Sequence, residues 1–303
     1  MTNMIETSMT EKRQINTPSQ RSGPNLRKWG RKTPWFIGLF LALALALASL
    51  LPLYWMIIGS FKIQTNAMAV PPEFWPSAPT LENWQKLLFG RSPTWRWLLN
   101  SIAVASISAA LAVLTSALAG YAFGKKDFPG RKLLFWLIII TMMLPKQISL
   151  IPLFILMRKL DWFNTYQGMI VPWIAYPFGI FLFKQYMQSI PNELIEAARI
   201  DGAGELRTFF NIVLPLSKPA IGALSIFAFV AAWNDFLWQL ILVTERNMFT
   251  LPVGVSKLVS NLSNYNLGLA MAGATFAFIP MLIVFLAFQD YFVKGITLGA
   301  VKG

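Results

Sequence analysis

Six apolar segments, each long enough to cross a lipid bilayer, constrain this chain more than any other feature of its sequence. A membrane-spanning helix needs about 20 consecutive, mostly apolar residues. The segments lie near residues 35–58, 98–123, 133–157, 166–183, 220–243 and 269–293. Because lipid offers no partner for backbone polar groups, each segment is expected to be a helix. The sequence therefore predicts an all-α integral membrane protein with six spans.

The composition agrees with this fold class and excludes several chemistries. Of 303 residues, 55% are hydrophobic and 13% are charged, whereas a soluble domain carries about 25% charged residues. The chain has no His and no Cys, so we expect no catalytic residues, no metal site and no disulfide built from them. The net charge of +13 accompanies long apolar segments, which favours an anionic lipid surface over nucleic acid as a partner.

The distribution of Lys and Arg predicts the orientation of the chain. The loops and tails on one side of the six spans contain 16 Lys and Arg residues, against 8 on the other side. Since the more basic side normally faces the cytoplasm, both termini are predicted to be cytoplasmic. Residues 1–34 are polar and basic, and we expect them to be a mostly disordered tail attracted to the membrane. Residues 35–303 are expected to form one six-span domain.

The cytoplasmic loop 184–216 has an unusual concentration of acidic residues. Four of the 13 acidic residues of the chain lie within it, namely Glu193, Glu196, Asp201 and Glu205. Pro191 suits the first turn of a helix, and Gly202 suits the left-handed conformation that ends many helices. One narrow apolar face is expected to contain Leu194, Ala197 and Ala198. The pattern predicts a short helix, a glycine turn and a second helix lying along the cytoplasmic surface.

The residues of this loop follow a spacing that is also found in other membrane proteins. Glu196-Ala197-Ala198 is followed after three residues by Gly202, and after nine more by Ile212-Val213-Leu214-Pro215. This pattern resembles the EAA loop of ABC-importer permeases. Further motifs of this sequence resemble motifs of carbohydrate importers. They are Asn100-Ser101, Asp201-Gly202-Ala203, Lys218-Pro219, Trp233-Asn234-Asp235-Phe236 and Val301-Lys302-Gly303. The likeness is to the smaller permease subunit of maltose-type and glycerol-phosphate-type importers.

The resemblance implies a type I ABC importer permease with a cytoplasmic coupling helix. In that family the EAA loop docks onto a separate ATPase. When ATP binding closes the ATPase, the loop transmits this movement to the membrane helices. Carried over residue by residue, this ATPase coupling is assigned to Glu196, Ala197, Ala198, Asp201, Gly202 and Ala203, with Leu214 and Pro215 shaping the exit of the loop. Without the resemblance, an amphipathic helix resting on the lipid surface would explain the loop equally well.

The expected partners follow from the same resemblance. The sequence contains no phosphate-binding loop of the Gly-x-x-x-x-Gly-Lys-Ser/Thr type, so ATP and Mg²⁺ are expected on a separate ATPase chain and no cofactor on this one. The chain is thus expected to be a transport subunit and not an enzyme. The family implies a second homologous permease, a dimer of ATP-binding subunits and an extracytoplasmic solute-binding protein. The expected location is the inner membrane of a bacterial-type cell, and the expected cargo is a carbohydrate or polyol.

Polar residues within the predicted spans suggest a translocation path. Asn234 and Asp235 lie midway through the fifth span, with Trp238 one turn further. They either line the path, where they could hydrogen-bond sugar hydroxyls, or satisfy one another or a neighbouring helix. Lys146 follows Pro145 inside the third span, and we expect a kinked helix there, with polar groups facing the bundle.

A self-contained, ion-driven secondary transporter is the alternative function. Such carriers often contain inverted repeats and interrupted helices, but this chain shows no evident repeat. Only Asp235 offers a central carboxylate for ion coupling. Uptake that collapses with loss of ATP, and not with loss of an ion gradient, would separate the two functions. A membrane-embedded enzyme would need a catalytic constellation, and none is visible.

Overall fold

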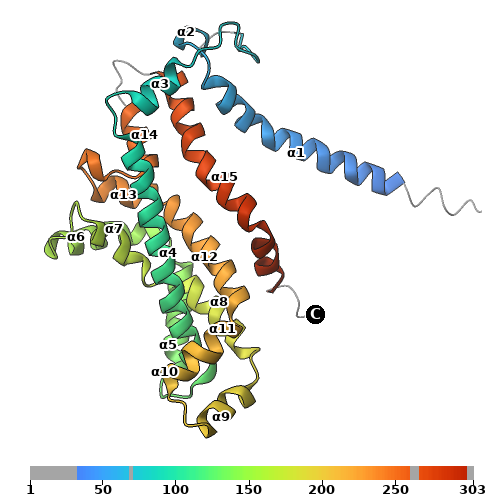
Figure 1. The fold of residues 1–303 in the computed structure, drawn as a ribbon, viewed down its shortest axis with the longest axis vertical. Coiled ribbons are helices and arrows are strands. Elements are labelled where there is room, and N and C mark those ends of the chain that lie inside the picture. The colour runs from blue at the N-terminus through green and yellow to red at the C-terminus, as the bar shows by residue number, and fades with distance from the viewer. Residues whose placement is uncertain (1–32, 68–70, 260–265, 299–303) are drawn as a thin grey trace, which may run out of the picture. The chain divides into compact units, whose positions relative to one another are not determined.

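The structure is a computed structural model that describes residues 33–67, 71–259 and 266–298, and it has no strand within these ranges (Figure 1). The chain divides into two units, residues 1–53 and 54–303, which are described separately. The tail predicted over residues 1–34 lies outside the described residues except for its last two, which begin the first helix.

The described part of the first unit is the greater part of α1 (Thr33–Gly59). The alternation of Leu and Ala between Leu41 and Ala48 has the period of a strand, yet the segment is helical throughout. This is the conformation in which an isolated apolar segment satisfies its own backbone polar groups. The stretch Phe36–Gly59 is long and apolar enough to be a membrane span, as predicted.

The second unit contains the remaining elements. Between α1 and the first long helix lie α2 (Gln64–Ala67) and α3 (Glu82–Phe89). The body consists of α4 (Thr94–Lys125), α5 (Arg131–Met143), η2 (Lys146–Ser149), α6 (Leu150–Lys159), α7 (Tyr166–Ile170), η3 (Val171–Trp173) and α8 (Pro177–Gln188). It continues through α9 (Asn192–Ile200), α10 (Glu205–Thr208), η4 (Phe209–Val213), α11 (Leu214–Leu216), α12 (Lys218–Trp233), α13 (Phe236–Leu242), η5 (Arg246–Met248), α14 (Leu251–Val259) and α15 (Leu267–Leu298).

All six predicted spans are helical, but they are not all continuous. Four stretches pass as single spans, and two bent helix pairs, Arg131–Met143 with Lys146–Lys159 and Glu205–Leu216 with Lys218–Trp233, would raise the number to six. The third predicted span bends by 100° between α5 and α6, and Pro145 lies at the break, as expected for a proline kink. The fifth predicted span, 220–243, is divided into α12 and α13 at Asn234 and Asp235. The helix is thus interrupted at the two polar residues of this otherwise apolar segment.

The centre of the second unit is α4, which packs against α8 and α12. Its inner face is built from small residues, and Ala112, Ala117, Ser108 and Ser116 are completely buried. Small residues let helix backbones approach closely in membrane proteins. At Gly120 the approach is so close that an added Cβ would overlap the Cβ of Phe183 on α8.

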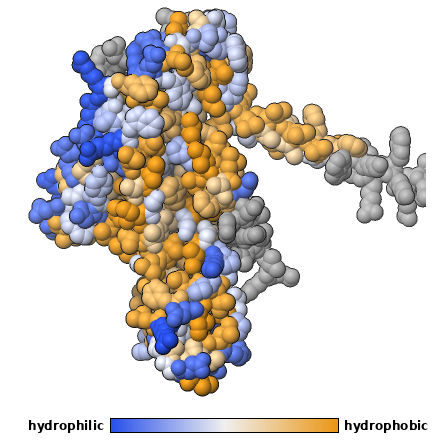
Figure 2. All heavy atoms as spheres, viewed as in Figure 1, coloured by the Kyte–Doolittle hydropathy of each residue, from blue (hydrophilic) through white to orange (hydrophobic). Residues whose placement is uncertain are grey.

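The surface of the second unit fits a membrane location. Figure 2 shows hydrophobic side chains over most of the visible body, with hydrophilic side chains gathered where α6 and α13 lie and again near α9. A polar–apolar–polar order along a helical body is typical of a protein that crosses a bilayer. The predicted class of all-α membrane protein is therefore confirmed by the arrangement of its helices.

Candidate functional site

The predicted cytoplasmic helix is α9, and its end has a well-defined cap. Pro191 precedes its first residue, and Glu193 lies in the first turn, where a negative charge favours the helix dipole. Gly202 has a φ of +76°, in the left-handed region. The Ala203 N–H donates to the Ala198 carbonyl (2.9 Å), and the Gly202 N–H donates to the Arg199 carbonyl (3.0 Å). These bonds form a Schellman motif, which stops the helix at the predicted glycine.

The structure divides the predicted apolar face of α9. Leu194 and Ala197 are exposed, whereas Ala198 packs inward together with Ile195, which the prediction did not include. Ile200 is 87% exposed and lies on the same outer face as Leu194 and Ala197. The outer face of α9 is therefore partly apolar and has no partner among the described residues.

The residues predicted to contact an ATPase occupy different environments. Glu196, Ala197, Asp201 and Gly202 are exposed, Ala203 is half-buried and Ala198 is buried. The second predicted helix is divided into α10, the π-helical turn η4 and α11. Leu214 is half-buried and Pro215 exposed at its end, immediately before the sharp bend into α12. The exposed members thus share one surface, while Ala198 positions α9 against the bundle.

Two consecutive lysines at the end of α4 hold the loop that contains α9. The Lys125 ammonium donates to the Asn192 Oδ1 (2.7 Å) and to the Ile190 carbonyl, both at the start of α9. The Lys126 ammonium forms an ion pair with Glu205, just beyond the end of α9. One end of α4 therefore contacts the chain on both sides of this short helix.

Glu205 is the centre of the second contact. Its Oε1 accepts a hydrogen bond from Arg199 (3.0 Å), and its Oε2 accepts one from the Tyr121 hydroxyl (3.1 Å). The hydrogen bond from Lys126, with those from Arg199 and Tyr121, lowers the pKa of Glu205 from 4.5 to about 2, against a smaller opposing effect of burial. Its carboxylate is therefore charged at every physiological pH.

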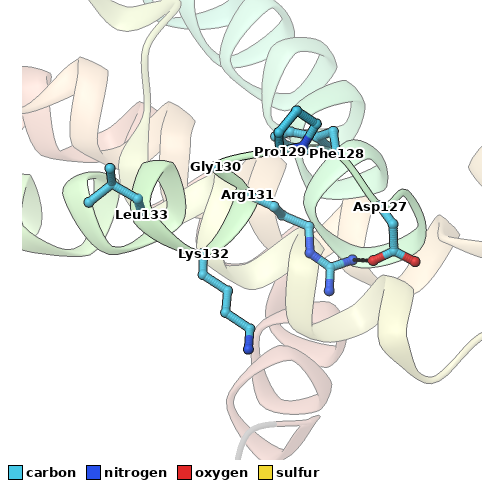
Figure 3. Close-up of a pocket in the computed structure, with 7 residues that line it drawn as sticks. All are labelled: Asp127, Phe128, Pro129, Gly130, Arg131, Lys132 and Leu133. Atoms are coloured by element: carbon cyan, nitrogen blue, oxygen red, sulfur yellow. Dashed lines mark ion pairs between the residues drawn. The ribbon is translucent and has the colours of Figure 1, made fainter.

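The turn after α4 fixes these lysines further. Arg131 donates to the Lys126 carbonyl (2.6 Å) and pairs with Asp127 (2.7 Å), while Gly130 adopts a φ of +81°. Figure 3 shows this ion pair and Lys132 pointing away from it, around a hollow of about 640 Å³ lined by residues 127–133. The turn holds the last carbonyl of α4 in place.

Sequence reasoning missed Tyr121, Lys125 and Lys126. The two lysines were assigned only to the basic cytoplasmic side, as part of the rule that sets orientation. Their position at the last turn of a long helix, opposite the acidic residues of loop 184–216, is the signal that could have identified them.

The polar residues of the fifth span lie at a meeting point of helix breaks. Asp235 separates α12 from α13 and lies near the Trp173 side chain, the Trp238 backbone and, without a direct ion pair, the charge of Lys146. Lys146 lies in the break between α5 and α6, and its ammonium is 4.4 Å from the centre of the Trp173 ring. Trp173 itself lies in η3, between α7 and α8. The breaks of the third and fifth predicted spans and the short turn η3 thus lie around one cluster of Asp235, Lys146 and Trp173.

The other two predicted path residues are placed differently. The Asn234 side chain is exposed and donates to the Val230 carbonyl (3.0 Å) of its own helix. Trp238 is buried, and its indole N–H donates to the Gly168 carbonyl (3.0 Å) on α7. The structure therefore associates Asp235 with Lys146 and not with Asn234, and it gives Trp238 a packing contact between helices.

The predicted external end of α4 holds a second loop. The Asn100 amide donates to the carbonyls of Asn247 and Phe249 (2.9 Å each), and the Trp97 indole donates to the Arg246 carbonyl (2.7 Å). The Ser101 hydroxyl accepts from the Leu251 N–H (2.7 Å). The motif Asn100-Ser101 thus has a visible role, which is to fix the backbone of residues 246–251.

Comparisons with known proteins identify relatives over most of the chain. The family described as "Binding-protein-dependent transport system inner membrane component" matches residues 112–298. The arabinooligosaccharides transport system permease protein AraQ of Bacillus subtilis is 38% identical over 261 residues, which cover 86% of this chain and 92% of AraQ. The trehalose/maltose transport system permease protein MalG of Thermococcus litoralis is 37% identical over 268 residues, covering 86% and 95%. The sn-glycerol-3-phosphate transport system permease protein UgpE of Salmonella typhi is 33% identical over 255 residues, covering 82% and 90%.

Solved structures share the fold. A chain from the crystal structure of a bacterial ABC transporter involved in the import of the acidic polysaccharide alginate has a TM-score of 0.75 and 23% sequence identity, covering 87% of this chain and 98% of that one. A chain of the MetNI methionine ABC transporter has a TM-score of 0.52 and 17% identity, covering 71% and 98%. At these identities the likeness concerns the fold alone, which is the permease fold predicted from the sequence.

Proposed function

The chain belongs to the inner membrane components of binding-protein-dependent transport systems, and on this premise we propose that it forms half of the path for a carbohydrate or polyol. It is a permease subunit and not an enzyme, because in this family a separate subunit hydrolyses ATP. The same membership removes the support for a self-contained, ion-driven transporter.

The cargo class rests on the relatives. The names of three of them specify arabinooligosaccharides, trehalose/maltose and sn-glycerol-3-phosphate. All three are polyhydroxylated, and Asp235 and Lys146, which lie beside the buried Trp173, offer hydrogen-bonding groups to such a solute. The solute would arrive from an extracytoplasmic binding protein and cross between this chain and a second permease.

The outer face of α9 is the observation that carries the coupling proposal. It presents Glu196, Ala197 and Asp201 together with the exposed apolar residues Leu194 and Ile200. Its end is fixed by the Schellman motif, and its flanks are held by Lys125 and Lys126. A rigid, partly apolar helix with acidic neighbours suits insertion into a groove of another protein. The protein proposed to provide this groove is the dimer of ATP-binding subunits, which would also hold ATP and Mg²⁺.

The proposed orientation places α9 and both termini in the cytoplasm. The excess of Lys and Arg in the loops on that side supports it. The loop around residues 246–251 lies at the opposite end of α4, so it would face the binding protein. Membrane lipid surrounds the body, and nucleic acid has no part in the proposed function.

A substitution on α9 tests the proposal. Ala197→Arg would place a long cation on the outer face of α9 and is expected to abolish copurification of the ATPase subunits and ATP-driven uptake. Ala78→Arg is the matched control, because Ala78 is also an exposed alanine but lies in the segment before α3. Normal assembly and uptake with Ala197→Arg would contradict the coupling assignment. A wild-type chain that purifies without any ATPase would contradict the proposed function as a whole.

A further inference from the structure

The helix α4 connects the two ends of the protein without interruption. It has 32 residues and no proline, and at a rise of about 1.5 Å per residue it is about 48 Å long. The third and fifth predicted spans, in contrast, are broken at Pro145 and at Asn234-Asp235. Figure 1 shows α4 running from the neighbourhood of α3 and α14 down to α9 and α10. A continuous helix transmits displacement along its axis better than a broken one does.

Both ends of α4 are bonded to loops that the proposed function places at opposite surfaces. In its first turns, Asn100, Trp97 and Ser101 hold the backbone of residues 246–251 through four hydrogen bonds of 2.7 to 2.9 Å. In its last turn, Lys125 and the adjoining Lys126 hold both flanks of α9. Side chains at the two ends of α4 therefore hold a loop at each surface of the protein.

The bonds at the outer end are hard to replace. Asn100 is 6% exposed and Trp97 is 1% exposed, and the Asn100 bond to the Phe249 carbonyl is buried, whereas the bonds to the Arg246 and Asn247 carbonyls are part-buried. Releasing a buried carbonyl from its donor costs free energy, because water cannot take the place of the donor. An added Cβ at Gly254 of α14 would overlap the Trp97 ring, which shows how closely α14, the helix that follows the loop, packs against α4. The loop and the first turns of α4 are therefore expected to move together.

We propose that α4 is a strut that couples the external loop 246–251 to the coupling helix α9, with Asn100 and Lys126 as the positioning residues at its two ends. This proposal rests on the proposed function, which supplies a partner at each surface. When a loaded binding protein displaces loop 246–251, α4 moves with it and shifts both flanks of α9. When the ATPase moves α9, the same contacts carry the displacement outward.

The test uses the assembled transporter in proteoliposomes, with its ATPase and its loaded binding protein. The quantity measured is the ratio of the ATPase rates with and without the binding protein. Asn100→Ala is expected to reduce this ratio towards unity although the ATPase remains assembled. Lys126→Gln is expected to do the same from the other end of α4.

Each variant has a matched control. The Asn83 amide on α3 is also buried, 3% exposed, and also donates to two carbonyls, those of Ser60 (3.1 Å) and Lys62 (2.9 Å). Asn83→Ala should therefore cost similar stability but leave the ratio much higher than Asn100→Ala does. Lys86 forms an ion pair with Glu82 (2.6 Å) away from α4, so Lys86→Gln is the control for Lys126→Gln.

A second pair of variants separates coupling from general damage. Lys126→Glu and Glu205→Lys each place like charges together, and each is expected to lower the ratio. The double variant restores an opposite pair and should recover part of the stimulation. An equal loss of ATPase stimulation in Asn100→Ala and Asn83→Ala would contradict the proposed coupling through α4. Full stimulation in both Asn100→Ala and Lys126→Gln would contradict it as well. A wild-type complex whose ATPase does not respond to any binding protein would overturn the proposed function, and the strut with it.

Discussion

Lys126, directly after α4, and Glu205, the first residue of α10, form an ion pair that closes a ring of contacts around α9, the proposed coupling helix. The Lys125 contact with Asn192 closes the other side. A helix of nine residues is marginal by itself in water. Its position relative to the membrane helices therefore depends on the contacts at its two flanks together with the packing of Ile195 and Ala198.

The titration of Glu205 tests the first of these contacts. With a pKa of about 2 in the folded protein against 4.5 otherwise, the carboxylate stabilises the fold above about pH 4.5, and this contribution is lost as the pH falls towards 2. The side chain is 57% exposed, so solvent screening keeps the contribution small. Carbon-13 NMR of labelled glutamate, assigned with Glu205→Gln, should show the low pKa. Lys126→Gln should raise it, and Lys86→Gln should not. An ordinary pKa in the wild type would contradict the contact.

The end of α9 depends on the left-handed conformation of Gly202. Any other residue at a φ of +76° costs about 1–2 kcal/mol, so Gly202→Ala should loosen the last turn of α9. Hydrogen exchange of the amides in residues 197–203 should accelerate about 5- to 30-fold. Gly204→Ala is the control, since both glycines have open space around them but Gly204 has a φ of −69°. Equal acceleration in both variants would show that the cap does not hold the helix.

Much of the fold could be predicted from the lengths of the apolar segments and from the charges of the loops between them. The six spans, the proline break at Pro145 and the glycine end of α9 needed only local rules, because each depends on residues close in sequence. The break at Asn234 and Asp235 was not predicted. A polar pair inside an apolar segment can be accommodated in a straight helix or at an interruption, and only the packing of neighbouring helices decides between them.

The contacts around the candidate site were less accessible to sequence reasoning. Lys125 and Glu205 are separated in sequence from their partners, and a charge on a cytoplasmic loop is usually solvated. The predicted apolar face of α9 contained Leu194, Ala197 and Ala198, whereas the buried pair is Ile195 and Ala198. In a helix of nine residues, two neighbouring faces satisfy the same apolar spacing, so the pattern alone did not choose between them.

The contact between α4 and α8 should tolerate no added atoms at Gly120. An alanine Cβ there would overlap both the Cβ and the backbone of Phe183, and overpacking of a rigid interface costs about 1–3 kcal/mol. Gly120→Ala should therefore lower the thermal unfolding temperature of the detergent-solubilised protein. Gly204→Ala, at a glycine of the same unit with open space around it and a φ of −69°, should not lower it. An unchanged unfolding temperature in Gly120→Ala would show that the two helices can separate.

The cluster of Asp235, Lys146 and Trp173 should affect transport more than stability. Asp235→Asn keeps the size of the side chain but leaves the charge of Lys146 without its counterpart, and we expect uptake to fall several-fold in an assembled complex. Adding Lys146→Gln should restore part of the uptake, because the cluster is again neutral. Glu82→Gln, which removes a carboxylate from an exposed ion pair on α3, is the control and should leave uptake near the wild-type rate. If Asp235→Asn lowers only the unfolding temperature and uptake is unchanged, Asp235 holds the helices together and does not line the path.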